Sequence, residues 1–218
     1  EYDKIDFVAG AYYFEEEGIN NQPLTFFLSF PGSFRIEQDV ESYAFFANVG
    51  YALTEDLRIS GGLRYTKDEK KARVNINSSL IDTSTKKDYD DISWEVSATY
   101  DLNEDLTVYG TVQKGYQSGQ FPARPFCLFG FLDFTQPGNV NPVNCFTSTE
   151  NLTALNYEAG IKGQPFDNLQ MSLAVFRTDY KNLPYQVSTT AVGGFNTVNI
   201  VVDQNSTGVE WESTLRLF

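Results

Sequence analysis

Residues 41–66 read ESYAFFANVGYALTEDLRISGGLRYT, and this stretch decides the fold. Apolar residues alternate with mostly polar or small ones on both sides of the segment Thr54-Glu55-Asp56. Successive side chains on a β-strand point to opposite faces, so the pattern predicts two antiparallel strands joined by a tight turn. One face of this hairpin is predicted to carry Tyr43, Phe45, Ala47, Val49, Tyr51 and Leu53, followed by Leu57, Ile59, Gly61, Leu63 and Tyr65.

The length and polarity of these two strands favour a membrane. They exceed the roughly 5–6 residues usual in soluble sheets and reach the roughly 9–11 residues with which a tilted strand crosses a bilayer. Aromatic residues lie at or near the ends of the apolar face. Transmembrane β-barrels have such an apolar outer band between aromatic girdles, together with a polar interior. We therefore predict a membrane hairpin whose turn lies on the periplasmic side.

The same alternation predicts eight strands in one partial barrel domain, residues 1–218. Their expected ranges are residues 5–14, 40–53, 57–66, 92–102, 106–116, 154–162, 169–180 and 207–217. The connections are alternately long and short, as in outer-membrane barrels, which have tight periplasmic turns and long external loops. A soluble β-sandwich shares the alternation but has no reason to sort its loops by length. The predicted fold class is therefore an all-β, antiparallel transmembrane barrel.

Composition and charge exclude several functions. The net charge of −13 argues against a nucleic-acid partner, because phosphates select basic surfaces. The sequence has no histidine, which removes the commonest general base and the commonest imidazole metal ligand. No catalytic triad, phosphate loop or metal signature is visible, so we expect no enzyme, no catalytic residue, no cofactor and no metal site. Glu1-Tyr2-Asp3-Lys4 does not resemble a signal peptide, and we expect an internal segment of a longer protein.

Four segments resemble the barrel domain of TonB-dependent outer-membrane receptors, and they occur in that family's order. They are residues 39–70 (DVESYAFFANVGYALTEDLRISGGLRYTKDEK), 106–121 (LTVYGTVQKGYQSGQF), 156–182 (NYEAGIKGQPFDNLQMSLAVFRTDYKN) and 206–212 (STGVEWE). The resemblance implies a 22-stranded barrel with an inserted plug domain, of which this chain supplies about eight strands. Neither the plug nor a TonB box is recognisable here.

The resemblance also implies a function and a location. Such receptors lie in the bacterial outer membrane and take up a scarce solute, most often a ferric siderophore. The partners it implies are that siderophore-like ligand and TonB, which acts through the unseen plug. The barrel wall would contact outer-membrane lipid and lipopolysaccharide, and a surface lipoprotein is a further possible partner.

Candidate ligand contacts lie near the expected outer mouth of the barrel. Gly115 and Gly119 mark the point where the fifth strand leaves the membrane, and glycine in a strand often marks a bulge or a close backbone approach. Barrel-rim geometry alone also accounts for these glycines. The candidates for ligand contact are Tyr116, Phe121, Arg124 and Tyr185.

Cys127 and Cys145 lie in the longest connection, and we expect them to form a disulfide. An oxidising exterior favours such a bond, and a metal site would need more cysteine or histidine partners than the sequence offers. The bond would order an exposed aromatic loop that either packs on its neighbours or contacts ligand.

Strand alternation also places charged residues on the inner face. We expect a hydrogen-bonded lining that meets the plug, with direct ligand contact as the alternative. The residues are Arg58, Arg64, Glu95, Glu158, Lys162, Glu210 and Glu212. Lys114 and Arg177 fall instead on the lipid face near the outer strand ends, where their stems can snorkel toward head groups.

Two other architectures stay open. One is a complete eight-stranded outer-membrane barrel with a structural or adhesive role, and the other is a soluble β-sandwich binding module. Pairing between the first and last strands would indicate the closed eight-stranded barrel.

Overall fold

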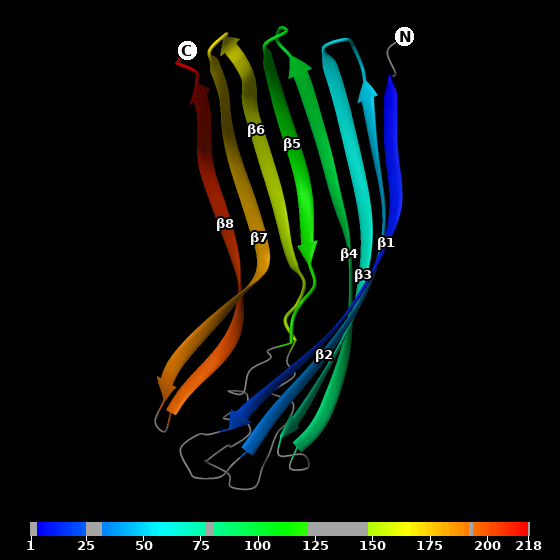
Figure 1. Ribbon diagram of the computed structural model, residues 1–218, viewed down its shortest axis with the longest axis vertical. Coiled ribbons are helices and arrows are strands. Elements are labelled where there is room, and N and C mark those ends of the chain that lie inside the picture. Colours follow the sequence, from blue (N-terminus) through cyan, green and yellow to red (C-terminus); the bar gives the residue numbers. More distant parts are fainter. Residues whose placement is uncertain (1–3, 25–31, 77–80, 122–147, 192–193, 218) are drawn as a thin grey trace.

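A computed structural model describes residues 4–24, 32–76, 81–121, 148–191 and 194–217. They form one antiparallel sheet in which the strands follow one another in chain order (Figure 1). The strands are β1 (Ile5–Leu24), β2 (Gly32–Ala52), β3 (Leu57–Ile76), β4 (Ile81–Asp101), β5 (Leu106–Gln117), β6 (Leu152–Phe166), β7 (Leu169–Ala191) and β8 (Gly194–Leu215). The predicted all-β, eight-stranded antiparallel fold is confirmed. None of the described residues forms a helix that could span a membrane.

Short polar turns set the register of the first hairpins. The Leu53 amide donates to the Leu57 carbonyl at 2.8 Å, and the Leu57 amide donates to Thr54 Oγ1 at 2.9 Å. In the β4–β5 turn, Asn103 Oδ1 accepts hydrogen bonds from the amides of Asp105 and Leu106, both at 2.9 Å. Such side-chain acceptors stabilise tight turns by satisfying backbone donors. The three short turns, the start of β1 and the end of β8 lie at the top of Figure 1, which we call the turn end.

The membrane half of the sheet is apolar on its outer face. Phe45 and Leu63 are 65% and 62% exposed, and they belong to a band of exposed apolar side chains that runs across every strand of the sheet except β5. Soluble monomers rarely expose so large an apolar surface. Because a lipid-facing strand buries this surface in hydrocarbon instead of in a protein core, the band identifies the membrane-facing side.

The polarity of the two faces reverses where the strands leave this band. Along β3, Leu63 and Tyr65 are followed on the same outer face by Lys67, Glu69 and Lys71. The inner face changes in the opposite sense: it carries charged residues beside the apolar band and buried apolar residues beyond it. These buried inner-face residues are Ile36, Ala72 and Val74. A sheet in water keeps its apolar face covered, so the reversal marks the membrane boundary near Tyr65.

Six of the strands, β1–β4, β7 and β8, extend far beyond the ranges predicted from sequence. Residues 15–24, expected to be an irregular connection, extend β1, and β2 begins at Gly32. Pro23 lies near the end of β1, opposite Ser33 of β2. The stretch around Pro184, also expected to be irregular, belongs to β7 and pairs with β8.

The sheet splits beyond the membrane. Pairing between β4 and β5 stops at Trp94↔Lys114, whereas β4 itself extends to Ile81. The four-strand ribbon therefore comprises residues 14–24, 32–42, 67–76 and 81–91 of β1–β4. The two-strand ribbon comprises residues 181–191 and 194–203 of β7 and β8. These ribbons end separately at the bottom of Figure 1, which we call the loop end.

The described sheet is open. β1 and β8 are its two edges, and no pairing joins them within the described residues. The alternative of a closed eight-stranded barrel therefore finds no support.

Among the described residues, Gly163 is the one glycine whose φ is positive. Its φ is +149°, and an added Cβ would lie 1.9 Å from the Asp105 carbonyl oxygen, next to the irregularity between Gly163 and Phe166. We expect Gly163→Ala to destabilise the full-length protein by about 1–3 kcal/mol, the usual cost of a strained backbone position. The measurement is the temperature at which the folded, fast-migrating form is lost in SDS gels. Gly115→Ala is the matched control, since nothing lies within 4 Å of its added Cβ, and an equal effect of both variants would contradict the assignment.

Candidate functional site at the inner face and loop end

Several predicted lining residues form pairs on the inner face. Arg58 forms an ion pair with Asp6 across β2. Arg64 Cζ lies 5.4 Å from the ring centre of Tyr12, and Arg64 Nε donates to Thr66 Oγ1 at 3.1 Å. A guanidinium over an aromatic face is attracted by the ring quadrupole. The inner face therefore holds its arginines by carboxylate and aromatic contacts.

A second cluster on the inner face joins β5 and β6. Tyr109 donates its hydroxyl proton to Glu158 Oε1 at 2.8 Å, and Lys162 Nζ lies 5.5 Å from the Tyr109 ring centre. The ring lies over Gly160, where an added Cβ would approach it to 2.8 Å. A glycine covered by an aromatic ring on the neighbouring strand keeps the sheet packed where a side chain is missing.

Three lining carboxylates differ from these clusters. Glu95, Glu210 and Glu212 have neither a hydrogen-bond nor an ion-pair partner among the described residues, and Glu210 and Glu212 are exposed on β8. They are available to another polar surface inside the lumen.

Two lysines meet around one tyrosine at the loop end. Lys70 and Lys87 are directly opposed on β3 and β4, and their Nζ atoms lie 5.7 and 5.0 Å from the Tyr89 ring centre. Like charges directly opposed across a ladder are unfavourable, and the buried ring, 3% exposed, offsets this by cation–π attraction. Burial lowers the pKa of Lys70, although Asp68 acts in the opposite direction. Lys70 Nζ donates to the Gly119 carbonyl at 2.9 Å.

Candidate Tyr116 lies beside this cluster, where β5 separates from β4. Its hydroxyl donates to Asp68 Oδ2 at 3.1 Å. Burial, followed by the charge of Asp68, raises the pKa of Tyr116 well above its usual range. Lys114, expected to reach toward lipid head groups, instead donates to both carboxylate oxygens of Asp91 at 2.7 and 2.8 Å.

Candidate Phe121 is 8% exposed and packs at the base of the long connection. The two ends of this connection pair there, since the Thr149 amide donates to the Gln120 carbonyl at 3.0 Å and the Gln120 amide to Thr149 Oγ1 at 2.8 Å. Candidate Arg124 and the predicted disulfide partners Cys127 and Cys145 lie outside the described residues.

A β-bulge turns candidate Tyr185 toward the inner side. The ladder changes from Tyr180↔Gln204 to Leu183↔Val202, so two residues of β7 oppose one of β8. Asn182 has a φ of 58°, a conformation that asparagine tolerates better than most residues. Beyond the bulge the alternation shifts by one, and the Tyr185 hydroxyl donates to Gln204 Oε1 at 2.5 Å on the lumen side. Simple alternation would have placed Tyr185 on the outer face.

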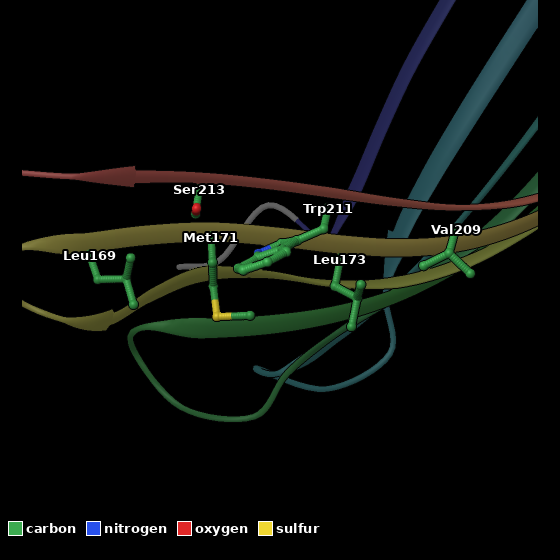
Figure 2. Close-up of a pocket in the computed structure, with 6 residues that line it drawn as sticks. All are labelled: Leu169, Met171, Leu173, Val209, Trp211 and Ser213. Carbon is green, nitrogen blue, oxygen red and sulfur yellow. The ribbon is translucent and has the colours of Figure 1, made fainter.

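A hollow of about 420 Å³ lies on the outer face of β7 and β8 (Figure 2). Ser213 is small beside the 72% exposed Trp211, which leaves a gap over the sheet. The lining residues are Leu169, Met171, Leu173, Val209, Trp211 and Ser213. The lining contains no titratable group and lies in the lipid-facing band, so the hollow suits an acyl chain and not a polar solute. No group of three potential metal ligands occurs among the described residues.

Ion pairs cover the outer face of the four-strand ribbon. Arg73 Nη2 lies 2.6 Å from Asp82 Oδ2 and Arg73 Nη1 lies 3.8 Å from Glu37 Oε2. Glu69 is shared by Lys71 at 3.1 Å and Lys86 at 2.5 Å. The hydrogen bond from Arg73 holds the pKa of Asp82 below its usual value.

Comparison with known proteins connects these features to one family. A sequence profile described as "TonB dependent receptor-like, beta-barrel" matches residues 3–218. The whole chain superimposes on 31% of the ferric yersiniabactin uptake receptor FyuA from Yersinia pestis, with a TM-score of 0.78 and 19% identity. It also superimposes in full on 34% of the siderophore receptor PiuA from Acinetobacter baumannii, with a TM-score of 0.68 and 17% identity.

The copper transporter OprC shares the fold as well. There 97% of this chain covers 41% of the transporter, with a TM-score of 0.62 and 14% identity. The chain thus spans between about a third and two fifths of these relatives, and identities this low show a common fold alone.

The Arg73–Asp82 pair predicts a pH-dependent ribbon tip. Because the folded pKa of Asp82 is depressed, its stabilising contribution is present above the unfolded value, about 3.9, and is lost as the pH falls through the folded value. We expect amide hydrogen exchange at the β3–β4 tip, normalised to intrinsic rates, to rise between about pH 6 and about pH 3. In Asp82→Asn the tip should exchange faster at both values and respond less to pH. An unchanged pH response in the variant would contradict this role.

Proposed function

Because this chain belongs to the TonB-dependent receptor β-barrel family and lies in the outer membrane of a Gram-negative bacterium, we propose that it forms part of the wall of an uptake receptor for a ferric siderophore. The observation that carries the proposal is the family match over residues 3–218, together with a sheet that superimposes in full on siderophore receptors. The remaining strands and the plug would come from other parts of the protein.

Different parts of the sheet suit different roles in such a receptor. The outer band anchors the wall in lipid, and the loop-end ribbons surround the entrance on the outside. The inner face presents paired arginines and tyrosines together with the carboxylates of Glu95, Glu210 and Glu212. These carboxylates would contact the polar surface of the plug. TonB, driven by the proton gradient of the inner membrane, would pull on the plug to release the solute inward.

A chelated iron is favoured as solute by the names of two relatives, a ferric yersiniabactin receptor and a siderophore receptor. A copper transporter with the same fold makes copper the second candidate. The candidate ligand-contact residues differ in how exposed their side chains are. Tyr185 is exposed on the inner side of the two-strand ribbon, whereas Tyr116 and Phe121 are packed against neighbours. Arg124 and the Cys127–Cys145 disulfide stay predictions.

The function is tested by comparing a deletion of the complete gene with its parent. The probes are radiolabelled iron bound to hydroxamate, catecholate and phenolate siderophores, copper(II) ions and vitamin B12. We expect the deletion to abolish the uptake of one ferric siderophore, and a protonophore to abolish the same uptake in the parent. Loss of copper uptake alone would favour the second candidate, and normal uptake of every iron complex would contradict the proposal.

Tyr185 provides a residue-level test. Loss of an aromatic contact worth about 0.5–1.5 kcal/mol weakens binding roughly 2–10-fold, so Tyr185→Ala should raise the Kd of the transported siderophore by that factor. Tyr185→Phe separates the ring from the hydrogen bond to Gln204. The control is Tyr157→Ala, because Tyr157 is equally exposed, 43% for each side chain, but faces lipid. Equal Kd values for the Tyr185 and Tyr157 alanine variants would remove Tyr185 from the ligand site.

A further inference from the structure

The two loop-end ribbons are not joined by a continuous backbone ladder. β5 ends at Gln117 and β6 begins at Leu152, while β4 and β7 continue beyond them on either side. Beyond the ends of these ladders, no strand pairing joins the two ribbons within the described residues. Residues 148–151, at the end of the long connection, lie in the gap between the ribbons and contact both of them.

Asn151 makes one contact in each direction. Its Nδ2 donates to the Asp90 carbonyl of the four-strand ribbon at 3.1 Å. Its own carbonyl accepts a hydrogen bond from Asn182 Nδ2 of the two-strand ribbon at 3.0 Å. Asn182 is the bulge residue, and its amide donates to Asp203 Oδ1 at 3.1 Å, which ties it to β8. One residue therefore connects β4 to the β7–β8 pair.

The preceding residues strengthen the attachment to the four-strand ribbon. The Tyr89 hydroxyl donates to the Thr149 carbonyl at 3.3 Å, and Lys87 Nζ lies 3.2 Å from Glu150 Oε1. Tyr89 is itself buried between two lysines, so it offers a fixed point of attachment. The contacts come from three successive residues of one short segment.

We propose that residues 148–151 form a strap that couples the two-strand ribbon to the four-strand ribbon, with Asn182 and Tyr89 as its two attachment points. A net hydrogen bond contributes about 0.5–1.5 kcal/mol, so several acting together keep two otherwise independent ribbons in one arrangement. Displacement of either ribbon is then transmitted across the mouth. This coupling does not depend on which solute is carried.

The test measures the distance between the ribbons in the full-length protein in lipid nanodiscs. Nitroxide side chains are introduced as encoded amino acids at positions 88 and 201, because thiol labelling would involve the native cysteines. Both positions are exposed on the outer side. Double electron–electron resonance should give a narrow distance distribution in the parent.

Two variants remove the contacts of the strap with one ribbon each. Asn182→Gly removes the side-chain donor and keeps the positive φ, since glycine adopts it freely. Tyr89→Phe combined with Lys87→Gln and Asn151→Ala removes the side-chain contacts with the four-strand ribbon. We expect each variant to broaden the distribution about two-fold, and Arg73→Gln, which breaks an ion pair inside one ribbon, to leave it unchanged.

Migration of the folded form in SDS gels shows that each variant has assembled its barrel. An unchanged distribution in both strap variants would overturn the proposal. Broadening in Asn182→Gly alone would also overturn it, because that result assigns the effect to a looser bulge.

Discussion

Backbone hydrogen bonding in hydrocarbon is the constraint on which this structure depends. Lipid offers no donor or acceptor, so each N–H and C=O in the membrane must pair with a neighbouring strand. The ladders from β1 to β8 meet this requirement in the interior of the sheet. The same constraint requires strands against the open edges of β1 and β8 when the sheet lies in a bilayer. A wall segment of a larger barrel satisfies it, and an isolated sheet does not.

The surrounding medium then decides which face is apolar. In lipid the outer face carries Phe45 and Leu63, whereas the inner face holds charges in pairs such as Arg58–Asp6. Beyond Tyr65 the outer face meets water and becomes a network of ion pairs, and the inner face buries Ala72 and Val74. A single strand thus has its apolar face toward lipid within the membrane and its apolar face toward the inside once it enters water.

Release from lipid also permits the sheet to divide. Beyond the membrane, water and side chains satisfy backbone groups, so β5 and β6 stop while their neighbours continue. The resulting gap is occupied by polar contacts from Lys70, Tyr89 and Asn151. Contacts of this kind hold the described ends of the long connection between the two ribbons.

The sequence by itself determined the strand order, the two faces and the short turns, because a period of two is a local property of neighbouring residues. It also indicated the family, through segments that keep their order. It underestimated the lengths of the strands that contain Pro23 and Pro184. A proline signals a break locally, but the sequence around it does not show that a neighbouring strand pairs there. The sequence placed Lys114 toward lipid because its Asp91 partner lies on another strand.

Only the tertiary structure decided where the candidate side chains lie. One extra residue at Asn182 moved Tyr185 to the lumen side, and the end of β4–β5 pairing let Tyr116 reach Asp68. A register shift changes the face of every residue beyond it, yet its origin lies in pairing between strands. Alternation therefore predicts which face the side chains of the membrane strands occupy. At the loop end, side-chain positions depend on contacts between residues distant in sequence.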